Sequence, residues 1–140
     1  NGARGLLWAS QVAPGNENNL RIRVYGTKGG LEWKQEHPNQ LHWSPFGQPT
    51  QVIARATGAA NAAAARVSRI PAGHPEGYLE GFATLYSEIA QAIRAARKGG
   101  SKADKAAHFP SLEDGIKGVA FIEAVVASSK RGGRWTKLSA

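Results

Sequence analysis

Residues 69–78 read RIPAGHPEGY, and they separate two parts of the chain that have different hydrophobic patterns. Before this stretch, apolar and polar residues alternate with a period of two, which is typical of half-buried strands. After it, apolar residues recur with the period of a helix face. The sequence therefore predicts that residues 69–78 join a sheet to the helix that follows it.

Two long helices are predicted after this stretch. The first runs from Pro75 to about Arg97, and its apolar face is formed by Tyr78, Phe82, Leu85, Tyr86, Ile89 and Ile93. The second begins after Ser111, which is a good N-cap, and Asp114 three residues later completes a variant of the capping box. The glycine pair at 132–133 ends this helix.

Short strands are predicted at 5–13, 20–25, 31–35, 40–44, 51–55 and 134–138, and 57–66 is predicted to be a loop with a helical turn. The turn GTKGG at 26–30 is short enough to make an antiparallel hairpin, and it needs a positive φ angle. Strands followed by helices predict an α+β fold. We expect a mostly antiparallel sheet of about five to six strands, with two long helices packed on one face.

The other face of the sheet is expected to be open for oligomerisation. Four aromatic residues are candidates to line it: Trp8, Trp33, Trp43 and Tyr25. An open face that carries aromatic side chains suggests burial against a partner subunit or another domain.

Length and composition limit the class of protein. The 140 residues suit a single domain, and the absence of cysteine excludes disulfides and thiolate metal sites and fits a cytoplasmic protein. No apolar run approaches the ~20 residues that span a membrane. The net charge of +8 raises the question of nucleic acid. The basic residues are scattered or lie near predicted helix C-termini, so solubility and helix-dipole complementation are favoured.

His74 is the most distinctive polar residue. It precedes Pro75, which suits an N-cap followed by proline at the first helical position. A helix dipole disfavours the cationic imidazole, so this placement predicts that His74 is neutral at pH 7. The residues alone leave two interpretations open, a simple helix start or a loop that faces a ligand. His37 and His42 lack carboxylates at ligand spacing, so no metal site is predicted.

Four stretches together resemble the C-terminal domain of the Gfo/Idh/MocA oxidoreductases, the glucose–fructose oxidoreductase and inositol dehydrogenase family. They are ASQVAPGNEN at 9–18, LRIRVYGTKGGLEW at 20–33, PAGHPEGY at 71–78 and EDG at 113–115. The resemblance covers nearly the whole chain and keeps the order of the motifs.

The resemblance implies that 1–140 is a C-terminal α/β domain that binds substrate and forms subunit contacts. In the family, an N-terminal Rossmann domain binds NAD or NADP, and a hydride moves between the nicotinamide and a carbon of a sugar, cyclitol or related polyol. The dinucleotide fingerprint, the catalytic lysine and the aspartate–histidine pair of the family match no segment of this chain. The chain alone is therefore expected to hold no catalytic residue and to bind no cofactor.

The resemblance also implies that the parent protein is an NAD(P)-dependent dehydrogenase or reductase and a homodimer or homotetramer. His74, Tyr78 and Gln11 are the candidate substrate-binding residues of this domain. The alternative is a non-enzymatic module, either an assembly domain or a basic nucleic-acid-binding domain. The sequence does not distinguish the substrate, NAD from NADP, or the direction of the reaction.

Overall fold

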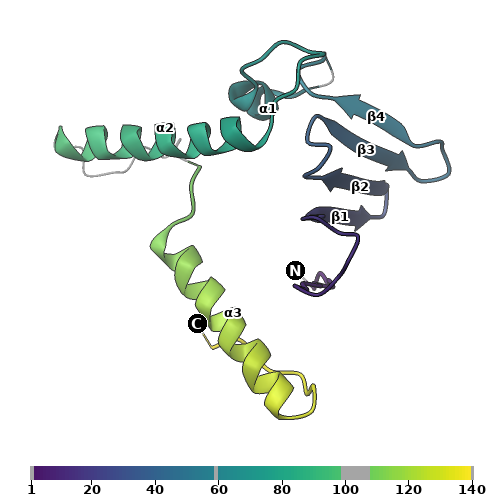
Figure 1. Ribbon diagram of the computed structural model, residues 1–140, viewed down its shortest axis with the longest axis vertical. Helices are drawn as coiled ribbons and strands as arrows, with labels where there is room; N and C mark the ends of the chain where they lie inside the picture. The colour runs from purple at the N-terminus through teal and green to yellow at the C-terminus, as the bar shows by residue number, and fades with distance from the viewer. Residues whose placement is uncertain (1, 59, 99–107, 140) are drawn as a thin grey trace. The chain divides into compact units, whose positions relative to one another are not determined.

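The computed structural model describes residues 2–58, 60–98 and 108–139, and the chain divides into a unit up to Gly81 and a second unit from Phe82. The first unit holds one antiparallel sheet whose strands follow the chain order (Figure 1). Its strands are β1 (Arg21–Gly26), β2 (Gly29–Lys34), β3 (Gln40–Pro45) and β4 (Gln51–Ala54). The α+β class and the antiparallel meander are confirmed.

The β1–β2 hairpin turns through Thr27 and Lys28, with Gly26 paired to Gly29. Gly29 has a φ of +151°, so the predicted positive φ is confirmed at this position. A Cβ atom here would lie 2.4 Å from the Ser44 carbonyl oxygen and 2.6 Å from the Trp43 ring. Only glycine therefore lets the turn lie against β3.

The strand register separates an apolar face from a polar face. The apolar face carries Ile22, Val24, Leu31, Trp33, Leu41, Trp43 and Ile53. The polar face carries Arg21, Arg23, Tyr25, Glu32, Lys34 and His42. The expectation that Trp33, Trp43 and Tyr25 share one face is wrong, because Tyr25 is in the opposite phase of the pleat.

Glu32 is the centre of the polar face. Its Oε1 lies 3.4 Å from Arg21 Nε, 3.6 Å from Arg23 Nε and 3.6 Å from Lys34 Nζ. Burial acts to raise the pKa of this carboxyl, but the charges of Lys34, Arg23 and Arg21 outweigh it and lower the pKa below its usual value. Three cations around one anion leave the polar face with a surplus of positive charge.

The sheet has four strands in the described residues, so the prediction of about five to six is wrong. Residues 5–13 pair with no strand, and their apolar side chains are exposed, Leu6 at 96% and Val12 at 86%. A strand needs a neighbour for its N–H and C=O groups, and the described part of the chain supplies none here.

Residues 134–138 do not form the predicted strand either, because side chains at the end of the preceding helix hold them. Ser128 Oγ donates to the Arg134 carbonyl at 2.8 Å, and Arg131 Nη2 donates to Thr136 Oγ1 at 2.6 Å.

Three helices follow the sheet. They are α1 (Ala62–Val67), α2 (Tyr78–Arg97) and α3 (Leu112–Lys130). The helical turn predicted within 57–66 corresponds to α1, which Asn61 caps by accepting from the Ala64 N–H at 2.9 Å. The two long helices α2 and α3 have 20 and 19 residues.

The predicted start of α3 is confirmed in detail. Ser111 Oγ accepts from the Asp114 N–H at 3.2 Å, and Asp114 Oδ2 accepts from the Ser111 N–H at 2.9 Å. These reciprocal bonds form a capping box, in which two N–H groups that the helix leaves unpaired are satisfied. At the other end, the Gly133 N–H bonds to the Ser128 carbonyl at 2.9 Å, and Gly132 and Gly133 have positive φ angles.

Candidate functional site

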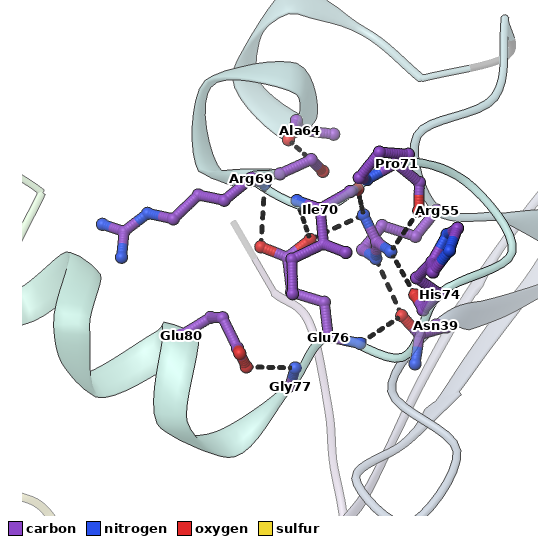
Figure 2. A network of polar contacts seen from close by, with 11 residues as sticks. Asn39, Arg55, Ala64, Arg69, Ile70, Pro71, His74, Glu76, Gly77 and Glu80 are labelled. Carbon is purple, nitrogen blue, oxygen red and sulfur yellow. Dashed lines mark hydrogen bonds and ion pairs between the residues drawn. The ribbon is translucent and has the colours of Figure 1, made fainter.

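A buried ion pair joins Arg55, the residue after β4, to Glu76 in the stretch that separates the sheet from α2 (Figure 2). Arg55 Nη1 and Glu76 Oε2 are 2.6 Å apart, with side-chain exposures of 15% and 4%. Glu76 also accepts from two backbone N–H groups, those of Arg69 at 2.8 Å and Ile70 at 3.3 Å. A buried carboxylate is tolerated only when it is paired and hydrogen-bonded in this way.

The guanidinium of Arg55 also binds three carbonyl oxygens of the same stretch. Nη1 donates to Ile70 at 2.6 Å, and Nη2 donates to His74 at 2.7 Å and to Pro71 at 3.3 Å. One side chain at the end of β4 thereby fixes the backbone on both sides of Gly73, which has a φ of +84°.

Asn39, in the turn between β2 and β3, joins the ion pair to the sheet. Its Oδ1 accepts from Arg55 Nε at 2.7 Å and from the Glu76 N–H at 3.2 Å. Its carbonyl oxygen accepts from the Arg55 N–H at 2.9 Å. We call Asn39, Arg55 and Glu76 the clamp.

The clamp corrects the predicted start of the first long helix. This helix begins at Tyr78, so the prediction of His74 as N-cap and Pro75 as first helical residue is wrong. The bonds of Glu76 to Arg55 and to two backbone amides hold it out of the helix. With His74 four residues before the helix, the dipole argument for its neutral form no longer applies.

The residue before α2 is Gly77, and its N–H donates to Glu80 Oε2 at 2.8 Å. This bond, together with the N–H of Glu80 itself, lowers the pKa of the Glu80 carboxyl below its usual value. A Cβ atom on Gly77 would lie 2.9 Å from Pro38 Cγ, so this glycine allows the helix start to lie close to the β2–β3 turn.

A cleft of about 500 Å³ lies between these two segments. Its walls are residues 36–40, from the β2–β3 turn, and residues 75–80, at the start of α2. The polar side chains among them belong to Glu36, His37, Asn39, Gln40, Glu76, Tyr78 and Glu80. The surface of the cleft is nevertheless mostly apolar, because Asn39 and Glu76 bond within the clamp and Glu80 bonds to the Gly77 N–H.

The three sequence-predicted site residues are not all brought together. Tyr78 lines the cleft and is exposed. His74 is exposed on the same stretch, and in Figure 2 the dashed lines reach its carbonyl oxygen but not its ring. Gln11 lies in the irregular segment before β1 and is not among the residues of this cleft.

Sequence reasoning missed the clamp and the turn residues of the cleft. The sequence signals were an arginine at the end of a strand and an asparagine after proline, and asparagine is common in surface turns whatever its contacts. Among the described residues, no three His, Asp or Glu side chains gather to hold a metal ion. No helix within the described ranges is long and apolar enough to cross a membrane.

Residues 1–138 match the family described as "Oxidoreductase family, C-terminal alpha/beta domain", the Gfo/Idh/MocA group. The chain belongs to this family. It is 31% identical over 137 residues to the uncharacterized oxidoreductase YfiI of Bacillus subtilis, covering 98% of this chain and 35% of that protein. The predicted resemblance is confirmed.

Solved structures agree with this assignment. An oxidoreductase from Sinorhizobium meliloti shares 58% identity at a TM-score of 0.83, over 91% of this chain and 35% of its own. An inositol dehydrogenase homolog from Azotobacter vinelandii, complexed with NADH and myo-inositol, shares 39% identity at a TM-score of 0.88, over 93% of this chain and 34% of its own. The chain therefore spans about a third of the length of these relatives.

Proposed function

We propose that this chain is the C-terminal domain of an NAD(P)-dependent oxidoreductase that acts on a sugar, a cyclitol or a related polyol. The observation that carries the proposal is the likeness to the inositol dehydrogenase homolog complexed with NADH and myo-inositol. A fold alone does not imply a function, so the cleft beside the clamp, with Tyr78 on its wall, is the second support.

In this proposal the domain binds substrate and does not itself transfer the hydride. The dinucleotide fingerprint and the catalytic lysine of the family match no segment of the chain, so an N-terminal Rossmann domain of the parent would supply them and hold NAD or NADP. The domain would close the substrate pocket from the opposite side.

The cleft and its rim are the proposed contact with substrate. Tyr78 and His74 would offer hydrogen bonds to hydroxyl groups, since phenol and imidazole can each donate or accept. Gln11 stays a prediction, and its place would depend on how the segment before β1 pairs in the parent protein.

The two faces of the sheet suggest how the domain is assembled. Both long helices carry exposed apolar side chains, among them Phe82, Ile93, Ile116 and Ile122, and we propose that these surfaces and the apolar face of the sheet are covered in the parent protein. The polar face would then stay open as the contact between subunits of a homodimer or homotetramer. A hollow of about 590 Å³ lies on this face, lined in part by Tyr25, Glu32 and His42.

The test is an activity assay of the parent protein. We expect it to reduce NAD⁺ or NADP⁺ with at least one member of a panel of inositols, aldoses and linear polyols. Residues 1–140 alone, assayed beside it, should show no turnover. A lack of nicotinamide reduction or oxidation across the whole panel, in either direction, would contradict the proposal.

A further inference from the structure

Every donor of the Arg55 guanidinium is already in use. An arginine offers five N–H donors in a planar fork. Here Nε donates to Asn39, Nη1 serves the Ile70 carbonyl and Glu76, and Nη2 serves the carbonyls of Pro71 and His74. Five acceptors match five donors, so this side chain has nothing left for a substrate.

The backbone of His74 is correspondingly fixed on both sides. Its N–H donates to the Pro71 carbonyl at 3.3 Å, and its carbonyl accepts from Arg55 at 2.7 Å. Gly73 before it has a left-handed backbone, and Pro75 after it has a locked φ angle. These contacts fix the direction of the Cα–Cβ bond of His74, and the residue is exposed.

The charge of the clamp is balanced locally. Glu76 neutralises Arg55 at 2.6 Å and is satisfied by the amides of Arg69 and Ile70. Neither charge of the pair is therefore available to draw an ionic substrate, and the pair has a geometric role. A lysine at position 55 could keep the ion pair but not the fork, because its three donors lie on a single atom.

We propose that Arg55, held by Glu76 and Asn39, is the positioning residue that sets the direction in which His74 meets a hydroxyl group of the substrate. This inference rests on the proposed function, and it adds a role for a residue that cannot touch the substrate itself. Hydrogen bonding to a hydroxyl is sensitive to direction, so a small rotation of the His74 backbone weakens binding.

The kinetic test uses the full-length protein with the best polyol of the panel. Arg55→Lys should raise KM by about tenfold with kcat changed by less than about twofold, which indicates lost binding shared by ground state and transition state. His74→Ala should raise KM by a similar factor. The double variant should be no worse than His74→Ala alone, because the lysine then has no ring left to misplace.

A merely structural role for Arg55 predicts a different result. In that case the KM effects of the two substitutions multiply in the double variant, and this outcome would overturn the inference. An unchanged KM in Arg55→Lys would overturn it as well. Asp114→Asn is the matched control, since it weakens the cap of α3 and leaves the clamp intact, and it should lower the melting temperature with KM unchanged.

A second readout does not depend on turnover. In the proton NMR spectrum of the full-length protein, the His74 ring signal, assigned through His74→Ala, should shift in Arg55→Lys while the signals of His42 and His108 stay in place. A His74 signal that does not move would overturn the inference that Arg55 positions His74. If wild-type protein turns over no polyol, the proposed function fails, and this spectrum still decides whether Arg55 positions His74.

Discussion

Gly29 shows how strongly one residue can be constrained by the strand beside it. Gly29→Ala would place a Cβ atom 2.4 Å from the Ser44 carbonyl oxygen at a φ of +151°. We expect the free energy of unfolding to fall by roughly 2–4 kcal/mol, because steric overlap adds to backbone strain. Chemical denaturation of the full-length protein measures the change.

Gly81→Ala is the matched control for Gly29→Ala. Gly81 lies inside α2, with no other atom within 4 Å of its added Cβ. The same substitution should here raise the free energy of unfolding by about 1 kcal/mol, since alanine is the better helix former. Similar changes at both glycines would contradict the steric argument.

At the scale of the residue, the sequence predicts features that depend on neighbours along the chain. It does not predict contacts between residues that are far apart in the chain. The positive φ of the 26–30 turn follows from a local rule and is found at Gly29. The bond between Glu76 and Asn39 joins residues 37 positions apart. No local pattern of the sequence encodes such a pair, so the clamp was not predictable.

At the scale of the element, the capping box of α3 makes stability depend on pH. Hydrogen bonds from the backbone N–H and the hydroxyl of Ser111 lower the pKa of Asp114 below its ordinary value of 3.8. A carboxyl with a depressed pKa in the folded state adds stability above its unfolded pKa, and this stability is lost as pH falls through the folded pKa. We expect Asp114→Asn to lower the melting temperature near neutral pH and to make it less dependent on pH below about 4.

Melting curves between about pH 6 and about pH 2 measure this effect. Glu123→Gln, an exposed carboxylate on the same helix, is the control and should keep the wild-type pH dependence. Equal acid sensitivity in wild type and Asp114→Asn would show that the capping box does not contribute to the pH dependence.

Elements were predicted well where their own residues complete them. The start of α3 and the β1–β2 hairpin satisfy their N–H and C=O groups locally, and both were found near the expected residues. Residues 5–13 have the composition of a strand, but a strand exists only against a neighbour. Residues 134–138 do not form the predicted strand, because Ser128 and Arg131 bind them to the end of α3.

At the scale of the whole molecule, exposed apolar surface indicates partners. Ala120 is the one apolar residue buried in the described part of the chain, while large apolar side chains are exposed in both units. Large exposed apolar patches mark surfaces that pack against another part of a protein or against a partner. The chain spans about a third of the length of the relatives it matches.

The two faces of the sheet therefore make different predictions for assembly. Arg23 on the polar face lies 3.6 Å from Glu32, and Arg23→Glu would replace that attraction with repulsion. If this face is the contact between subunits, the association constant of the full-length protein should change by at least about tenfold, because the substitution alters charges that the interface would desolvate. Sedimentation velocity at several concentrations measures it. Lys98→Glu makes the same charge change outside the sheet and should leave the association constant as in wild type. Equal association in all three proteins would instead place the interface elsewhere.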